Sequence, residues 1–195
     1  MENIEKLRKN CWDNSLDSFG YVYIFDKRAS WFGSLVNWLK VFGVLVPALI
    51  GATALGGYTN DFLIYAINLA IPVTIIQFGF SILAIIYKWD DELSYSFESS
   101  QSHNAITKRF KRLAELPDEN YNQVNLEYEK LEIEYMQRCQ QDLKHNLKEW
   151  ELRKGMRYAL REFKRECEGC KTIPISMEST DCHVCGRFSL KYKIL

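Results

Sequence analysis

Four cysteines near the C-terminus form two CxxC pairs separated by eleven residues: Cys167, Cys170, Cys182 and Cys185. A gap of two residues lets both thiolates of a pair reach one metal ion, and two such pairs complete the tetrahedral shell that zinc prefers in closed sites. Four thiolates leave no open coordination position, so we expect a structural zinc that folds the tail rather than one that activates water. His183 lies inside the second pair and could compete as a ligand, but the four cysteines have the better spacing.

The segment that must position these cysteines has the pattern of a small zinc ribbon. Apolar and more polar residues alternate over residues 172–176 and 188–194, which predicts two short strands. Gly186 follows the second pair, where a backbone turn toward the metal requires conformational freedom.

Two uncharged stretches in the first half of the chain are long enough to cross a bilayer: residues 41–58 and residues 62–87. The second would extend roughly 39 Å as a helix, against a hydrocarbon core of about 30 Å. It must therefore tilt or bend, and Pro72 offers the place. Residues 57–61 are too few for a domain and suit a tight turn, so we predict a transmembrane helical hairpin.

Basic residues flank the outer ends of this hairpin and are missing from its turn: Lys27, Arg28, Lys40 and Lys88. Because positive residues stay on the cytoplasmic side, both termini are predicted to be cytoplasmic, and the cysteine pairs then face a reducing compartment that favours metal over disulfides. A signal peptide cleaved near residues 52–54 is an alternative, but its apolar segment would be about twice the usual length. A soluble protein that buries both stretches would need a longer chain.

Polar and small residues mark the two predicted spans. Thr74, Gln77 and Ser81 recur at helical spacing on the second span, where they either hydrogen-bond to a neighbouring helix or line water. None of them is ionisable, which favours the interhelical role over a pore. The first span has small residues that allow close helix contact: Gly43, Ala48, Gly51 and Ala52.

The region after the hairpin is predicted to be helical. An amphipathic helix that ends at Pro117 has apolar residues at helical spacing: Ile106, Phe110 and Leu113. No proline occurs from residue 120 to residue 165, which predicts one long, coiled-coil-like helix. Its apolar positions step by three or four residues: Val124, Tyr128, Leu131, Tyr135, Cys139, Leu143, Leu147 and Trp150. This stripe packs either as a hairpin on the preceding helix or against another subunit, and a homo-oligomer is the expected use.

Composition argues against two classes of protein. The chain has 25 basic and 25 acidic residues, so no global field would hold a nucleic acid. No phosphate-binding glycine loop, nucleophile elbow or metalloprotease motif occurs, so an enzyme is not expected. Cys11 and Cys139 have no partner at metal-ligand spacing and are interpreted as ordinary thiols.

These patterns together predict a mainly α-helical membrane protein with four segments. They are an N-terminal cytosolic segment (1–30), a two-helix transmembrane hairpin (31–89), a cytosolic region of long amphipathic helices (90–165) and a small C-terminal zinc ribbon (166–195).

A two-span hairpin with both ends inside and a helical cytosolic extension resembles the SLATT class of prokaryotic membrane effectors. The tail of CxxC, eleven residues and CxxC is similar to the family described as mobilome CxxCx(11)CxxC proteins. The resemblance implies an inner-membrane effector carried by mobile elements or defence islands, which perforates or depolarises the membrane when a partner senses phage.

Two hypotheses follow. In the first, the protein is such an effector: its hairpins assemble into a pore, the long helix sets the oligomer number, and the ribbon receives the signal from a sensor protein. In the second, it is a membrane-tethered adaptor whose zinc ribbon docks a protein or a nucleic acid.

Overall fold

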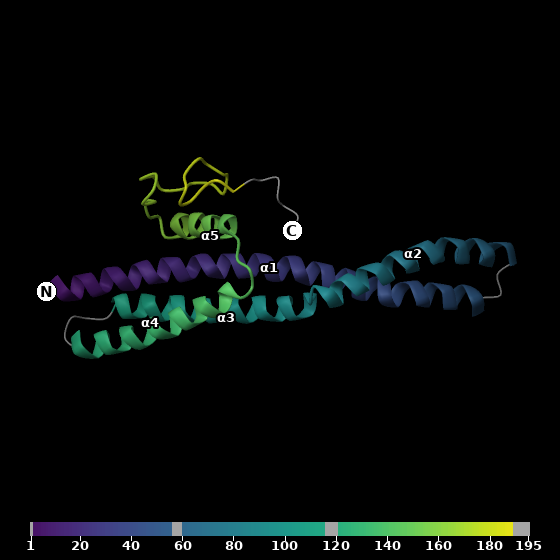
Figure 1. Cartoon of the computed structure of the whole chain (residues 1–195), viewed down its shortest axis with the longest axis horizontal. Helices are drawn as coiled ribbons and strands as arrows, with labels where there is room; N and C mark the ends of the chain where they lie inside the picture. The colour runs from purple at the N-terminus through teal and green to yellow at the C-terminus, as the bar shows by residue number, and fades with distance from the viewer. Residues whose placement is uncertain (1, 56–59, 116–120, 189–195) are drawn as a thin grey trace. The chain divides into compact units, whose positions relative to one another are not determined.

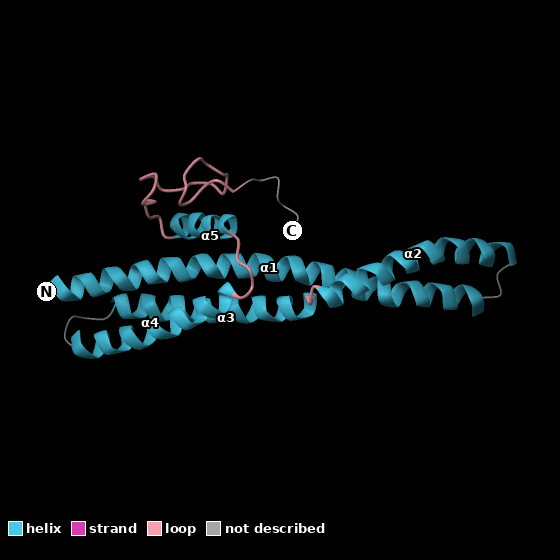
Figure 2. Cartoon of the chain, viewed as in Figure 1, coloured by secondary structure: helices cyan, strands magenta, loops and turns pink. Residues whose placement is uncertain are grey.

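The structure is a computed structural model that describes residues 2–55, 60–115 and 121–188 (Figure 1). These residues form helices α1 (Glu2–Leu55), α2 (Asn60–Ile86), α3 (Trp89–Glu115), α4 (Tyr121–Leu143) and α5 (Glu149–Glu162). None of the described residues lies in a strand (Figure 2), so the mainly helical fold class is confirmed.

The chain divides into two compact units. Unit 1 comprises Met1–Lys27 and Ser96–Leu195, and unit 2 comprises Arg28–Tyr95. Helices α1 and α3 each contribute residues to both units. The four segments expected from the sequence are not tested by this division and stay a prediction.

A three-helix core is the centre of unit 1. Residues three or four apart on α1, α3 and α4 meet in one hydrophobic cluster: Leu7, Cys11, Ile106, Phe110, Leu113, Val124, Tyr128, Leu131 and Tyr135. The first turns of the chain, expected only as a cytosolic segment, are therefore an essential part of this core. Of the two expected roles for the apolar stripe of α4, packing on the preceding helix is the one observed.

The prediction of a single long helix over residues 120–165 is wrong, because α4 ends at Leu143 and α5 begins at Glu149. The backbone N–H of His145 donates to the carbonyl of Asp142 (3.0 Å), and Asn146 then adopts a left-handed conformation with a φ of 50°. Asparagine tolerates this conformation better than most residues, which makes it a suitable place for a helix to stop. The break lets α5 leave the direction of α4.

Helix α5 packs on another face of α1, where it forms a second hydrophobic cluster with the cysteine segment. A Cβ atom at Gly155 would lie 2.6 Å from the carbonyl oxygen of Gly20, so the two backbones approach as only glycine allows. Next to this contact, the ring of Tyr158 stacks on Phe19 (5.6 Å between centroids) and on Tyr23 (4.4 Å). The cysteine segment is thus anchored to the helices through α5.

Helices α1, α3 and α4 also share a buried polar network. The His103 Nε2 atom lies 2.6 Å from Asp142 Oδ2, and Ser99 Oγ donates to Asp142 Oδ1 (2.7 Å). The Ser18 hydroxyl donates to the carbonyl of His103 (3.0 Å), and Tyr21 stacks on the imidazole at 4.8 Å between centroids. All four polar side chains are inaccessible to solvent, so water screens the network little and it fixes how the three helices align.

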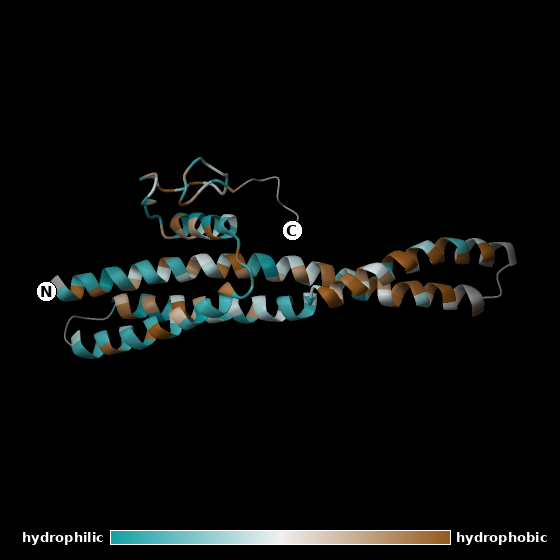
Figure 3. Cartoon of the chain, in the orientation of Figure 1, coloured by the Kyte–Doolittle hydropathy of each residue, from teal (hydrophilic) through white to brown (hydrophobic). Residues whose placement is uncertain are grey.

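Two helices are long and apolar enough to cross a membrane: α1 within Asn3–Ala52, whose C-terminal part lies in unit 2, and α2 within Ile67–Ile86 in unit 2. In their most apolar windows only 6% and 0% of the residues are buried, in contrast to the core helix of a soluble protein. Figure 3 shows the hydrophobic colour concentrated on α2 and on the C-terminal part of α1. Helix α2 continues through Pro72, and most of the predicted turn over residues 57–61 lies outside the described residues.

Replacing Asp142 by alanine should lower the free energy of unfolding by about 3–5 kcal/mol, because His103 and Ser99 stay buried without their acceptor. Thermal unfolding of the detergent-solubilised protein, followed by circular dichroism, measures this loss. The matched control is Glu134→Ala, which removes the exposed partner of Arg109 (2.5 Å) and should cost less than about 1 kcal/mol. Equal losses in the two variants would contradict a stabilising role for the buried pair.

Candidate metal centre

The four cysteines predicted as metal ligands come together in unit 1, with all four Sγ atoms within 4.8 Å of one another. The Sγ atoms of Cys167 and Cys182 are 3.8 Å apart, as are those of Cys170 and Cys185. Thiolates about 2.3 Å from a tetrahedral metal ion lie about 3.8 Å from each other, whereas a disulfide needs about 2.0 Å. The sulfurs therefore have the spacing of a four-thiolate metal site.

Backbone hydrogen bonds shape the first CxxC turn. The N–H of Cys167 donates to the carbonyl of Thr172 (3.1 Å), and the N–H of Lys171 donates to the carbonyl of Cys167 (2.7 Å). Lys171 has a φ of 54°, which turns the chain sharply after the second cysteine of the pair. A Cβ atom at Gly169 would lie 2.8 Å from Val184 in the other turn, so a glycine is needed for the two turns to meet.

The second CxxC turn uses the same pattern. The N–H of Gly186 donates to the carbonyl of Cys182 (2.9 Å), and that of Arg187 donates to the carbonyl of Thr180 (2.6 Å). A Cβ atom at Gly186 would collide with the Thr180 carbonyl oxygen. The left-handed φ falls on Arg187 (52°), so Gly186 is required for close approach rather than for the unusual backbone angle expected from the sequence.

The prediction of two strands in a zinc ribbon is wrong for the described residues (Figure 2). Residues 172–176 and Phe188 are outside any strand, and residues 189–194 lie outside the described part of the chain. Pro174 has no N–H to donate to a partner strand, and the carbonyls of Thr172 and Thr180 are used in the two turns. The described module is two CxxC turns joined by an irregular loop.

The thiols differ in how readily they ionise. The hydroxyl and backbone of Thr172 lower the pKa of Cys170 to about 6, and Cys170 is the exposed member of the group. Burial opposes ionisation of Cys182, but the backbone N–H groups of Cys185 and Val184 lower its pKa overall. Burial strongly raises the pKa of Cys185. A bound cation would favour the thiolate of Cys185, and the four ligands would leave it no open coordination position.

Arg157 is a site residue that the sequence analysis missed, because it lies in a stretch of mixed charges. Its Nε atom donates to the carbonyl of Ser176 (2.7 Å), and its Nη1 atom donates to Thr180 Oγ1 (3.3 Å) and to the carbonyl of Cys185 (3.3 Å). The same Nη1 atom lies 3.8 Å from Cys185 Sγ. Its burial against this module becomes visible only in the structure, where α5 is a separate helix.

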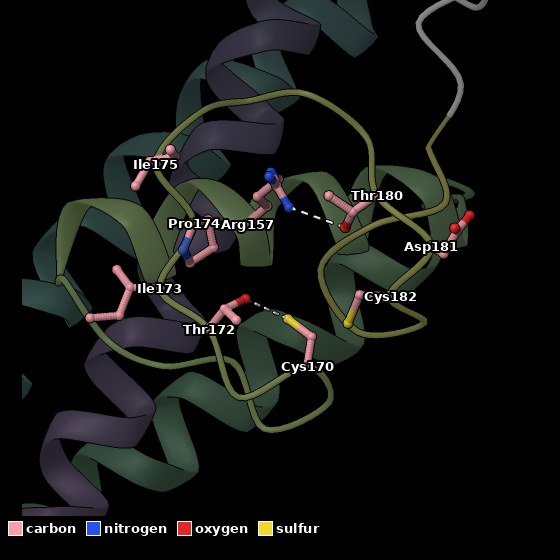
Figure 4. Close-up of a pocket in the computed structure, with 9 residues that line it drawn as sticks. All are labelled: Arg157, Cys170, Thr172, Ile173, Pro174, Ile175, Thr180, Asp181 and Cys182. Atoms are coloured by element: carbon pink, nitrogen blue, oxygen red, sulfur yellow. Dashed lines mark hydrogen bonds between the residues drawn. The ribbon is translucent and has the colours of Figure 1, made fainter.

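A pocket of about 380 Å³ opens beside the metal centre. Figure 4 shows its lining residues, which come from α5, from both CxxC turns and from the loop between the two turns. Ile173 and Ile175 on its rim are 45% and 92% exposed, and Cys170 and Cys182 contribute to its wall. The pocket therefore combines an apolar rim with the more open side of the metal centre.

The remaining cysteines and His183 lie outside the metal centre. Burial raises the pKa of Cys11 to about 11 and that of Cys139 to about 11, so both are protonated thiols at neutral pH. His183 is exposed, and its ring is not part of the four-sulfur group.

The polar stripe predicted on the second span lines a groove between α1 and α2 within unit 2. Thr74, Gln77 and Ser81 face Pro47 and Gly51 across a volume of about 530 Å³. Thr74 donates to the carbonyl of Ala70 (2.8 Å) and Ser81 to that of Gln77 (2.9 Å), so both hydroxyls are satisfied within their own helix. The stripe's role stays a prediction.

The small residues predicted on the first span are all exposed, and two of them lie near α2 or the groove. A Cβ atom at Gly43 would lie 3.4 Å from Gln77 Nε2, and Gly51 borders the groove. Ala48 and Ala52 are exposed. A Cβ atom at Gly51 would meet no atom within 4 Å, and the role expected for these small residues stays a prediction.

The fold and the site define a mainly helical protein with two apolar, membrane-length helices and a four-cysteine metal-type centre. The chain belongs to the family of mobilome CxxCx(11)CxxC proteins, whose sequence model matches residues 8–188. The family description names the cysteine spacing seen here, so the resemblance drawn from that spacing is confirmed. No curated protein and no solved structure matches the chain.

The purified protein should bind one Co²⁺ ion per chain with the intense absorption of a tetrahedral thiolate site. Cys182→Ser should lower the affinity at least about tenfold, because it removes one of four ligands in a closed shell. Cys139→Ser is the matched control and should keep the wild-type affinity, since Cys139 lies outside the centre. A wild-type protein without this absorption would contradict the metal assignment.

Proposed function

We propose that the protein is a membrane-embedded effector of a prokaryotic defence or mobile-element conflict system, which oligomerises and perforates or depolarises the inner membrane on a partner's signal. The supporting observation is that only 6% and 0% of the residues in the most apolar windows of α1 and α2 are buried in the described chain. The resemblance to SLATT effectors and the membership of a mobilome family are consistent with this role.

Membrane insertion explains the surface of unit 2. Large aliphatic side chains there are among the most exposed in the described residues, including Val44 (73%), Ile85 (77%) and Leu55 (91%). Such a surface is unfavourable in water and is satisfied by lipid. Lys40 and Asp90, which lie 3.9 Å apart and are both exposed, then mark the cytoplasmic interface.

Zinc is the ion we assign to the four-thiolate centre, because a closed tetrahedral set of four cysteines suits it. With both termini in the cytoplasm, the thiols stay reduced and available to the metal. The centre is structural in this proposal: it folds the tail, which receives the signal from a sensor protein.

Oligomerisation is required because a single two-helix hairpin cannot enclose a water-filled path. Besides its buried stripe, α4 carries a second apolar row on its solvent-exposed side: Leu126, Ile133, Met136 and Leu143. These residues are 52–66% exposed, and their spacing of seven and three residues is that of a coiled-coil seam. A second copy of the chain is the partner that we assign to this row.

The pocket beside the metal centre favours a second candidate function. With its exposed isoleucines, the pocket offers a place for a partner protein to dock. The protein would then be a membrane-tethered adaptor, and an unrelated two-span anchor could replace residues 28–95 without loss of function.

Induced expression should collapse the membrane potential of single bacterial cells, measured with a potential-sensitive dye. Ile133→Lys with Met136→Lys should prevent the collapse, because buried charges at a helix seam oppose assembly. The control is Gln123→Lys with Gln137→Lys, which adds the same two charges to exposed positions outside the row. Wild-type cells that keep their potential, together with a functional anchor replacement, would support the adaptor instead.

Membrane topology can be tested with a membrane-impermeant maleimide on intact spheroplasts. Asn60→Cys should be labelled at once, because residue 60 begins the second span on the outer side in this proposal. Asn104→Cys on the exposed face of α3 should be labelled only after permeabilisation. Labelling of residue 104 in intact spheroplasts would exclude a cytoplasmic unit 1.

A further inference from the structure

Arg157 is a buried cation whose place in the core needs a physical reason. The residue is only 6% exposed. Among the described residues, none of the ion pairs involves Arg157, so no carboxylate there balances its charge within 4 Å. A buried charge without compensation is strongly unfavourable, and natural cores pair such groups.

The metal centre supplies the missing negative charge. A divalent ion with four thiolates has a formal charge of minus two, and the guanidinium Nη1 atom lies 3.8 Å from Cys185 Sγ. An N–H group directed at a coordinated thiolate stabilises the metal-bound form, and groups of this kind around metal sites commonly change affinity by about 10–100-fold. Cys185 is fully buried, so no water lies between its sulfur and the guanidinium.

The same turn of α5 contacts the metal module on one side and α1 on the other. Arg157 holds the module through Ser176, Thr180 and Cys185, whereas Gly155 and Tyr158 contact α1. At about 100° per residue, Arg157 points roughly 130° away from the direction shared by Gly155 and Tyr158. Helix α5 therefore lies between the metal module and α1.

We propose that Arg157 is the positioning cation of the metal centre and that, through it, metal occupancy holds α5 in place on α1. This inference rests on the metal site of the proposed function and adds the route from the module to α1. Without metal, no ion holds the four sulfurs at one point, and the contacts of Arg157 with Cys185 and with the loop weaken. Helix α5 then keeps its contacts with α1 but loses those that Arg157 makes with the metal module.

Three variants of the full-length, detergent-solubilised protein separate this role from a purely structural one. Arg157→Met keeps the bulk and removes the charge, and Arg157→Lys keeps the charge with fewer donors. Arg153→Met, one turn earlier, is the matched control, because Arg153 pairs with the exposed Glu149 (2.9 Å). Zinc affinity is measured by competition with a chromophoric chelator, and the thiolate-to-metal band is recorded with Co²⁺.

We expect Arg157→Met to weaken zinc binding about 10–100-fold and to shift the Co²⁺ charge-transfer band to lower energy, because the bound thiolate loses its N–H donor. Arg157→Lys should recover part of the affinity, and Arg153→Met should match the wild type. Wild-type affinity and an unshifted band in Arg157→Met would overturn the proposal.

Hydrogen–deuterium exchange tests the link to α1 without any substitution. Chelation of zinc from the wild-type protein should speed exchange of the α5 amides at least about tenfold, while the α3 and α4 amides around His103 and Asp142 serve as an unchanged internal standard. Zinc-loaded Arg157→Met should resemble the chelated wild type. Unchanged α5 exchange after chelation would overturn the link. A wild-type protein that binds no metal would instead refute the metal centre itself.

Discussion

The burial of two faces of α1 is the constraint on which unit 1 depends. One face contributes Leu7 and Cys11 to the cluster with α3 and α4, and another contributes Leu16 to the cluster with α5. A single continuation of α4 could not cover both faces, so the chain must stop after Leu143 and approach α1 again from another side. The break before α5 is therefore a requirement of packing, and it places the metal module on the helical core through α5.

Helix α1 also changes its surroundings along its length. Its backbone hydrogen bonding continues from unit 1 into unit 2, while the composition of its surface changes from amphipathic to almost wholly apolar. Most of the buried residues of α1 lie in unit 1, whereas residues 41–52 of the helix are exposed or half-buried. In the proposed function, a helix with both kinds of surface connects unit 1 directly to the membrane segment.

The sequence predicted the local features well and the long-range ones poorly. The cysteine group was identifiable because CxxC spacing allows both cysteines of a turn to bind one ion. The apolar helices were identifiable because a long uncharged run is stable in only a few environments. His103 and Asp142 form a buried hydrogen-bonded pair although they are 39 positions apart in the sequence. Helical periodicity cannot predict a contact between two residues so far apart. The end of α4 was missed because Leu143, Leu147 and Trp150 keep helical spacing across residues 144–148. Such spacing alone does not show whether the backbone between these residues is helical. The prediction of two strands failed because alternation over a few residues is weak evidence for a strand. The backbone groups that a strand would need are used in the CxxC turns.

The uneven exposure of the four sulfurs has a chemical consequence. Cys170 is exposed and Cys182 is half-buried, whereas Cys167 and Cys185 are sealed from solvent by side chains of α1 and α5. Solutes that approach the four-sulfur group therefore reach Cys170 first, while the two buried sulfurs are shielded by the helical core.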